Sequence, residues 1–374
     1  MRRPRAATLA CAGLVLLAAG LRLWGLDLGL PQPNGRPDER EILSFTAGFA
    51  RRDWNPRWFV YPNLFFYTTW AWIQGVLRVT RWWQPVPSYA TLLTQDVAPL
   101  LYAGRLLSAV VGTATVWGVW RIARPRGGVA FGLAAAGLLA TSWLHVRDSH
   151  ALKTETLLAA GVLVSVWSLA RWVERPRRGA AIAAGVAIGV TMGFKYPGVF
   201  LLVPAWAATV MASRRRGIGR WLPTADLAVI VAAAVGAFAV TNPFLLFEIG
   251  RTSDTAAFLS LALYATRPDA AATPGAGWAT HLWDAFRSRA FVYHGVVSLR
   301  HGIGLLATLL LPLALLRAGR APAPPLVMLA AVFVVTYYPV AGASPVHLAR
   351  YMTPLTPLAA LLIAHLLVTA TERL

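Results

Sequence analysis

The chain has 374 residues, of which 57% are hydrophobic and 13% are charged, and its mean hydropathy is +0.55. Soluble domains carry about 25% charged residues, so this composition excludes an ordinary water-soluble enzyme. The net charge of +20 comes mainly from arginines between apolar stretches, where it indicates membrane orientation and argues against a nucleic-acid partner. We predict an all-α polytopic membrane protein.

Ten apolar stretches approach or reach the length of about 20 residues that a membrane-spanning helix needs. They are residues 6–24, 99–120, 128–145, 153–170, 179–194, 197–212, 224–247, 301–316, 323–340 and 351–370. Arginine-rich connectors between several of them, and three arginines before the first, predict one cytoplasmic face. Ten spans then place both termini in the cytoplasm of a multi-pass inner (plasma) membrane protein.

The apolar stretch 60–77 is expected to lie at the outer interface. If it crossed the membrane, every later arginine-rich connector would face outward, against the positive-inside rule. Its Trp and Tyr residues are the types that favour a membrane interface. We therefore predict interfacial amphipathic helices in the first outer loop.

The predicted outer loops carry most of the acidic residues. These loops are 25–98, 145–152, 248–300 and 341–350, and with their boundaries they take twelve of the fifteen acids. The inner connectors are too short to fold separately, so we expect one integral membrane domain over 1–374. The active site is expected on the extracytoplasmic side.

The first outer loop contains a charged run at 36–41, and apolar residues follow it at helical spacing. This pattern predicts an amphipathic helix over about 38–52 along the membrane surface. Asp38 either caps this helix, with Glu41 completing a capping box, or has a chemical role. Since a helix N-terminus keeps a carboxylate ionised, Asp38 is a candidate general base toward an acceptor hydroxyl.

The segment 145–155 carries two histidines and several charges between two apolar stretches. It is either a solvated turn or part of a polar cavity, because ionisable groups at the start of a span usually face a cavity. Its two histidines are five residues apart and no cysteine pair accompanies them, so we predict no metal site. A divalent cation stays open, and no cofactor is expected.

The chain has two lysines, Lys153 and Lys195, and both map to the outer ends of spans. Arg350-Tyr351 opens the last span. Each cation either extends to the interface or binds a phosphate. Their coincidence on one face predicts a shared anionic ligand.

Several short motifs resemble family 39 membrane glycosyltransferases, which have the C-type glycosyltransferase fold and include protein O-mannosyltransferases and lipid A aminoarabinose transferases. They are Pro37-Asp38-Glu39, Asn55-Pro56, Tyr61-Pro62-Asn63-Leu64, Arg105-Leu106-Leu107-Ser108-Ala109, Ser149-His150, Thr154-Glu155, Phe194-Lys195-Tyr196, Thr241-Asn242-Pro243 and Arg350-Tyr351-Met352-Thr353-Pro354. Glu155 stands where the family usually has Asp.

The resemblance implies an inverting transfer of a sugar from a polyprenyl-phosphate donor to a hydroxyl or amine of a protein, lipid or glycan. It makes Asp38 the catalytic aspartate, with Lys195 and Arg350 at the donor phosphate. We assign catalysis to Asp38 and Glu39, and substrate binding to Tyr61, His150, Lys153, Glu155, Lys195, Tyr196, Arg350 and Tyr351.

The chemistry is consistent with these roles. A phosphate leaves the anomeric carbon as a stable anion and needs cations there, while a base on the opposite side of the sugar gives inversion. The alternative is a transporter or flippase for a lipid-linked or anionic substrate, but no repeat is evident. The enzyme requires Asp38, Glu155, Lys195 and Arg350 to converge around one outward-opening cavity.

Overall fold

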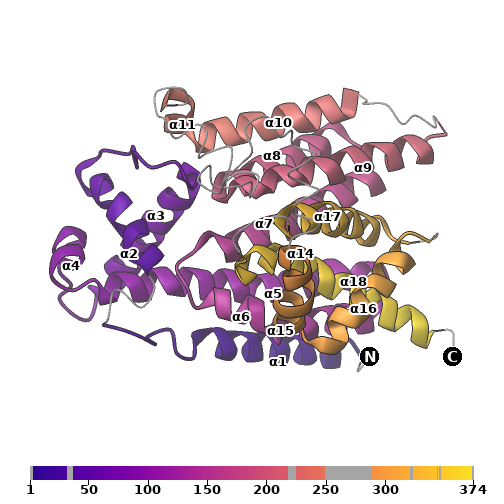
Figure 1. The fold of residues 1–374 in the computed structure, drawn as a ribbon, viewed down its shortest axis with the longest axis horizontal. Helices are drawn as coiled ribbons and strands as arrows, with labels where there is room; N and C mark the ends of the chain where they lie inside the picture. Colours follow the sequence, from indigo (N-terminus) through magenta and orange to yellow (C-terminus); the bar gives the residue numbers. More distant parts are fainter. Residues whose placement is uncertain are drawn as a thin grey trace.

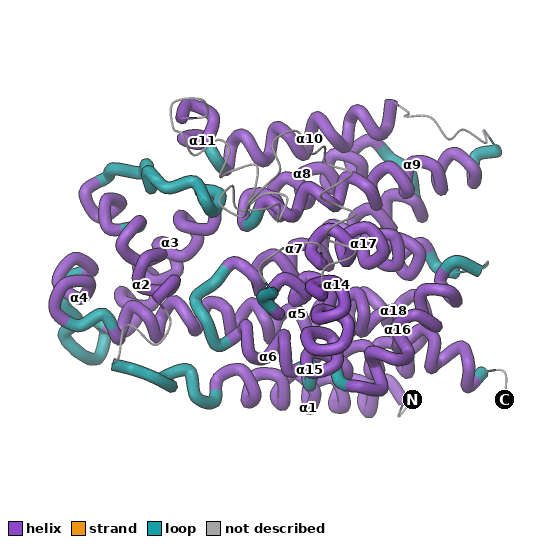
Figure 2. Tube along the Cα trace, in the orientation of Figure 1, coloured by secondary structure: helices purple, strands orange, loops and turns teal. Residues whose placement is uncertain are grey.

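The structure is a computed structural model that describes residues 3–31, 37–217, 225–248, 289–320, 323–342, 344 and 347–372. These residues form helices and connecting segments, and no strand occurs among them (Figures 1 and 2). The helices are α1 (Arg3–Leu23), α2 (Pro37–Phe45), η2 (Ala47–Arg51), α3 (Asn63–Thr80), α4 (Tyr89–Gln95), α5 (Ala98–Ala140), α6 (Trp143–Ser149), α7 (Thr154–Glu174), α8 (Arg178–Phe194), η3 (Tyr196–Leu201), α9 (Leu202–Arg215), α10 (Ala225–Thr241), α11 (Pro243–Glu248), α14 (Arg289–Tyr293), η4 (His294–Leu299), α15 (Arg300–Ile303), α16 (Leu305–Ala318), α17 (Pro325–Gly342), η5 (Ala349–Leu355) and α18 (Thr356–Thr371).

The apolar helices agree with a multi-pass membrane protein. Six helices in the described residues are long and apolar enough to cross a membrane, and the bent pair Phe291–Ile303 and Leu305–Ala318 makes up to seven. Helices α8 and α10 are apolar but shorter. All ten predicted stretches lie largely in helix, and α5 contains 99–120 and most of 128–145.

Helix α5 is 43 residues long because two helices meet in it at a break. Gly127 and Gly128 have non-helical backbone angles there, and Gly128 has φ +77°, which favours glycine. Beyond the break, a Cβ on Gly132 would lie 3.1 Å from the Trp120 and Arg124 side chains. The chain therefore turns back on itself at a basic connector, as the two predicted spans require.

Two local predictions are wrong in part. The span 301–316 does not start at 301, because Gly304, with φ +92°, separates α15 from α16 and the helices on its two sides are bent by 113°. The predicted surface helix over 38–52 ends as an α-helix at Phe45 and continues as the 3₁₀ helix η2.

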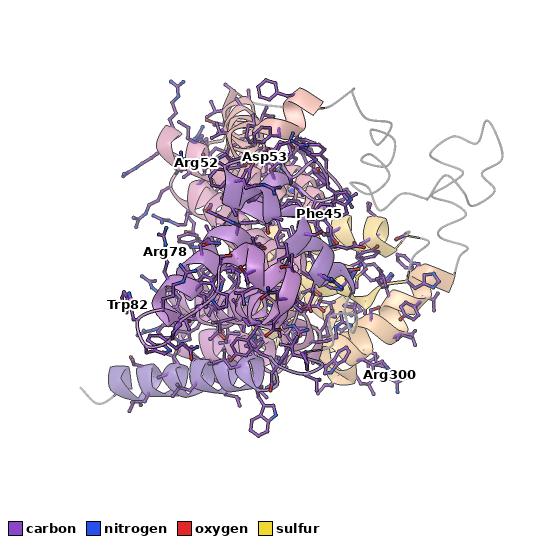
Figure 3. The ribbon with its side chains drawn as sticks, turned by 90° about the vertical axis from the view of Figure 1, so that its left-hand side faces the viewer. Phe45, Arg52, Asp53, Arg78, Trp82 and Arg300 are labelled. Atoms are coloured by element: carbon purple, nitrogen blue, oxygen red, sulfur yellow. The ribbon has the colours of Figure 1, made fainter. Side chains whose placement is uncertain are left out.

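The interfacial prediction for 60–77 agrees with α3, which is not among the helices long and apolar enough to span a membrane. Helices α2, α3 and α4 lie together at one end of the bundle, and both termini lie toward the opposite end (Figure 1). Figure 3 looks onto the α2–α4 end, with Phe45 and Asp53 on it and Arg78 and Trp82 at its margin.

Two apolar cores correspond to these two regions. The large one joins α1, α5, α7, α8, α9, α10, α16, α17 and α18. The small one joins α2, η2, α3 and α4 to the start of α5, and it is rich in aromatic rings. In it Phe45 stacks on Trp58 with centroids 4.5 Å apart, and Phe49 lies 5.5 Å from Trp54. Helices α2, η2, α3 and α4 thereby pack together as one unit, and Asp38 lies on α2.

Candidate functional site

Asp38 lies in the first turn of α2, directly after Pro37, a residue type that favours helix starts. Its Oδ2 atom is 2.9 Å from Nη1 of Arg350 and 3.1 Å from Nζ of Lys153. Lys153 directly precedes α7, and Arg350 lies in η5. Three segments far apart in the sequence thus meet at one carboxylate, which is 39% exposed.

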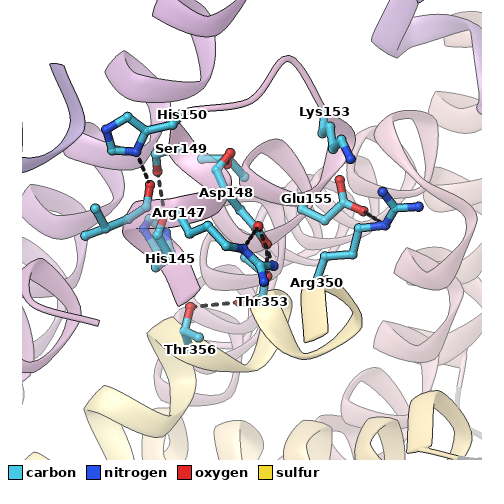
Figure 4. A network of polar contacts seen from close by, with 12 residues as sticks. His145, Arg147, Asp148, Ser149, His150, Lys153, Glu155, Arg350, Thr353 and Thr356 are labelled. Atoms are coloured by element: carbon cyan, nitrogen blue, oxygen red, sulfur yellow. Dashed lines mark hydrogen bonds and ion pairs between the residues drawn. The ribbon is translucent and has the colours of Figure 1, made fainter. Parts of the chain in front are cut away.

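Glu155 and Lys195 form a second, deeper ion pair. Nζ of Lys195 donates to Oε1 of Glu155 over 2.8 Å, and the two side chains are 9% and 1% exposed. Nε of Arg350 is 3.6 Å from the same oxygen, a contact drawn in Figure 4. Because Arg350 also contacts Asp38, it bridges the pair to Asp38. The expected convergence of Asp38, Glu155, Lys195 and Arg350 is present in the structure.

The cations keep the accessible carboxylate ionised. Partial burial raises the pKa of Asp38, but Lys153 and Arg350 lower it more, so that its pKa lies below the ordinary value. Tyr61 faces the same cluster, and burial together with Glu155 raises its pKa well above the usual range. Tyr61 therefore stays protonated beside Asp38 and Glu155.

Two further tyrosines that were predicted to bind substrate lie at this cluster or beside it. Nζ of Lys195 lies 5.7 Å from the centre of the Tyr351 ring, a cation–π contact. The Tyr196 hydroxyl donates to the Phe59 carbonyl over 2.6 Å, which attaches the first outer loop to η3. Tyr351 thus borders the charged centre, whereas Tyr196 holds one of its walls.

Glu39, the neighbour of Asp38, has different surroundings. Its side chain is 1% exposed, and Arg105 on α5 donates to both of its carboxylate oxygens at 2.7–3.2 Å. The Leu152 amide donates to it over 2.7 Å. Arg105 also donates to the carbonyls of Leu26 and Leu28. This pair joins α2, α5 and the segments after α1 and before α7.

His150 is directed away from the Asp38 cluster. Its Nδ1 atom lies 2.8 Å from the Val146 carbonyl, and its Nε2 atom lies 2.8 Å from the Trp24 carbonyl. Figure 4 places the ring on the far side of α6 from Arg350. These contacts hold α6 against the end of α1.

Asp148 belongs to the polar network but was not among the predicted site residues. It is buried, Arg147 contacts it at 2.6–2.8 Å, and the Thr353 hydroxyl donates to it. Burial raises the pKa of Asp148 above its ordinary value despite Arg147. The charged segment 145–155 indicated that Asp148 could belong to the site. Its partner Thr353 lies about 200 residues later in the chain, so the sequence did not indicate their contact.

The described residues contain no group of three or more His, Cys, Asp or Glu side chains arranged to hold a metal ion. Residues 249–288 of the predicted outer loop 248–300 lie outside the described residues. Asp254, Asp269 and Asp284 are among them.

The family model of dolichyl-phosphate-mannose-protein mannosyltransferases matches residues 85–247. The match includes α5 to α10, and with them Lys153, Glu155 and Lys195. Over these residues the resemblance to the family 39 glycosyltransferases that the motifs indicate is confirmed. No curated protein sequence matches the chain.

Solved structures show the fold. ArnT from Cupriavidus metallidurans bound to undecaprenyl phosphate superimposes with a TM-score of 0.60 at 18% identity, over 99% of this chain and 60% of ArnT. Apo ArnT gives 0.56 at 17% identity, over 90% and 55%. The Archaeoglobus fulgidus oligosaccharyltransferase in complex with zinc and sulfate gives 0.56 at 11% identity, over 97% and 50%.

The chain is therefore a multi-pass membrane protein with the C-type glycosyltransferase fold. It is similar over residues 85–247 to the dolichyl-phosphate-mannose-protein mannosyltransferases. It spans about half to three fifths of the length of the solved structures that it matches.

Proposed function

We propose that this protein is an inverting glycosyltransferase that moves a sugar from a polyprenyl-phosphate donor to an acceptor at the extracytoplasmic membrane face. The supporting observation is the Arg350 bridge, since one cation links the accessible carboxylate of Asp38 to the buried pair of Glu155 and Lys195. A base and phosphate-binding cations are thereby held together. ArnT, which has the same fold, binds undecaprenyl phosphate.

In the proposed reaction the acceptor oxygen or nitrogen attacks the anomeric carbon of the donor sugar. The bond from that carbon to the phosphate oxygen breaks, and its electron pair leaves with the polyprenyl phosphate. Asp38 takes the proton of the acceptor, and its lowered pKa keeps it available as a base at neutral pH. Because base and leaving group lie on opposite sides of the sugar, the configuration inverts.

Arg350 has two partners before the substrate binds, and its bond to Asp38 explains how the base is released. A donor phosphate competes with Asp38 for the guanidinium, because arginine forms bidentate contacts with phosphate as it does with carboxylate. When Arg350 moves to the phosphate, Oδ2 of Asp38 keeps Lys153, and the carboxylate loses one of its two cations, which makes it a stronger base for the acceptor proton. Lys195 supplies the second cation at the leaving group.

Glu39 is assigned a positioning role in this proposal. Arg105 and the Leu152 amide occupy its carboxylate, which is buried, so it holds α2 and the Lys153 segment in place and does not touch the sugar. His150 acts in the same way at the end of α1. In this proposal the cations of the chain supply the positive charge at the leaving phosphate.

The transporter alternative is less well supported. Transporters place their binding groups near the bilayer midplane on broken helices. Here Glu155 is the second residue of α7, Lys195 directly follows α8 and Arg350 precedes α18. The charged cluster therefore lies at helix ends. In this proposal the cluster is at the depth of the outer lipid headgroups, and both termini are cytoplasmic.

The test is the Asp38→Asn variant, with Asp53→Asn as its matched control. Asp53 lies in the same loop, is 44% exposed and pairs with Arg57 at 2.8 Å, so it has similar exposure and a similar partner. Whole-cell profiles of glycans and glycolipids, with and without the gene, would identify the sugar and acceptor. Undecaprenyl phosphate binding to the purified chain is measured in parallel.

We expect Asp38→Asn to lower transfer about 10²- to 10⁴-fold while undecaprenyl phosphate still binds, because only the base is lost. Asp53→Asn should transfer normally. Unimpaired transfer by Asp38→Asn would exclude Asp38 as the base. If no glycan depends on the gene but lipid-linked sugar fails to reach the outer leaflet without it, the protein is a transporter.

A further inference from the structure

Helix α7 connects the site to a second charged region at its other end. It starts at Thr154, next to Lys153, and ends at Glu174, which places the two ends roughly 30 Å apart at 1.5 Å per residue. At the far end the Gly127–Gly128 break of α5 meets the connector between α7 and α8. Arg126 and Glu174, which are 48 residues apart in the chain, form an ion pair there, so two basic connectors come together.

A cavity of about 720 Å³ lies between these connectors. Five arginines line it, from the end of α5's first half and from the α7–α8 connector. They are Arg121, Arg126, Arg171, Arg175 and Arg177. Two tryptophans, Trp117 and Trp167, line it as well. Arg171 lies 5.1 Å from the centre of the Trp167 ring, so a cation–π contact holds its guanidinium at the wall.

Among the described residues, ion pairs balance only part of the charge of this cavity. Glu174 is the acidic residue in its lining, and Arg126 occupies both of its oxygens at 2.8 Å. None of the other four arginines has an ion pair within the parts of the chain that the structure describes. A cavity of this size with four uncompensated guanidinium groups is complementary to an anion with several oxygen atoms.

A second cavity, of about 340 Å³, adjoins the first and is apolar. It runs between α1 and α5 and is lined by Val15, Ala19, Leu23, Val110 and Ala114, among others. Trp117, which is 50% exposed, lines both cavities. The two cavities therefore border each other at Trp117, with cations on one side and an apolar groove along α1 and α5 on the other.

We propose that this site binds a phospholipid with an anionic headgroup, whose phosphate lies among the arginines and whose acyl chain lies in the α1–α5 groove. Basic pockets between spanning helices on the cytoplasmic side favour such headgroups. Tryptophan favours the boundary between headgroup and acyl chain, which is where Trp117 lies. The apolar groove separates this ligand from a free phosphate or a nucleotide. The lipid ties α1, α5 and α7 together behind the site.

The test uses the purified full chain in detergent micelles and phosphatidylglycerol as the probe, with binding followed by native mass spectrometry and by the shift of the thermal midpoint. The variant is Arg121→Gln/Arg171→Gln. Its control is Arg215→Gln/Arg320→Gln, which removes the same charge from exposed arginines in other basic connectors outside the cavity lining. Phosphatidylcholine and inorganic phosphate are measured in parallel.

We expect the cavity variant to bind phosphatidylglycerol roughly 25-fold more weakly, because each arginine near an anionic headgroup contributes about fivefold. The control variant should bind like the natural chain, and phosphatidylcholine should not compete. Equal weakening in both variants would show attraction to net charge alone and would overturn the proposal.

Two further results test the acyl chain. Inorganic phosphate should give no thermal shift at the concentration where phosphatidylglycerol does, and an equal shift would mean that the site takes a free anion. Ala114→Phe fills the apolar groove and should weaken phosphatidylglycerol binding while the arginines stay intact. Unchanged lipid binding by a folded Ala114→Phe protein would contradict the assigned groove.

Discussion

The charged side chains at the two ends of α7 differ in how completely they are paired. At its start, Asp38 and Glu155 are paired with three cations at distances up to 3.6 Å, and the cluster carries one net positive charge. At its end, five arginines meet Glu174 alone. A nearly balanced cluster is held in place by its own ion pairs and still attracts a phosphate. The arginines that have no ion pair in the described part of the chain are available to bind an anionic ligand.

The largest effect should come from breaking a buried pair beside the site. Arg105→Met leaves Glu39 charged and buried without its partner, which should cost about 3–5 kcal/mol of unfolding free energy. Thermal unfolding in detergent, converted to free energy, measures it. Glu39→Gln/Arg105→Met removes both charges and should recover most of the loss. A cost of the single variant below about 1 kcal/mol would contradict this account of the pair.

A second effect separates the two lysines of the cluster. Lys195→Met should lower kcat/KM for the donor about 10²- to 10³-fold, because it removes a cation from the leaving phosphate. Lys153 is more exposed and contacts the base, so Lys153→Met should reduce kcat/KM less. Steady-state kinetics on the donor identified by glycan profiling gives both values. Equal losses would mean that the two lysines act as one patch of charge.

The pH dependence of transfer tests the cations around Asp38. Its pKa is lowered in the folded protein, so the ionised base persists as the pH falls until that lowered pKa is passed. Asp38 should therefore give no acid limb between pH 5 and 7. The Lys153→Met variant lacks one of the two cations that lower the pKa of Asp38, while partial burial still raises it. The pKa of Asp38 and the acid limb should therefore move to higher pH. Rates from pH 4 to 7 for both proteins are compared, and identical profiles would contradict the assignment.

The smallest effect is expected at the basic end. Arg126 and Glu174 form an ion pair at 2.8 Å that is partly exposed, so Arg126→Gln should cost about 0.2–1 kcal/mol. The cost should shrink as salt rises to about 1 M, because surface pairs are screened there. Unfolding at low and high salt measures the difference. A salt-independent cost as large as that of Arg105→Met would remove the contrast between the two ends.

Sequence reasoning found the residues of the site but only part of their arrangement. It brought Asp38, Glu155, Lys195 and Arg350 together because the motif order resembled a known family and the cations shared one face. It grouped Glu39 with Asp38 because the two are adjacent. Successive residues of a helix point about 100° apart, so Asp38 meets Arg350 while Glu39 meets Arg105. Adjacency in sequence therefore says little about shared contacts.

The contacts that sequence reasoning missed all join distant segments. Asp148 meets Thr353, and Trp117 borders one cavity with α1 and another with α7. The bend of 113° around Gly304 was also missed, because apolar residues continue on both sides of it. Hydropathy measures how well a residue tolerates the bilayer, and it contains no information about the direction of the next helix.

By itself the sequence determined the membrane class, the apolar helices and the residue types available for chemistry, because these follow from the hydrophobicity and charge of each residue in turn. Only the tertiary structure decided which charges are paired and which are left for a ligand. Pairing requires side chains from α2, α7, α8 and η5 to come within 4 Å, and helix packing sets those distances. In the described part of the chain, the same packing left four of the five arginines at the far end of α7 without an ion pair.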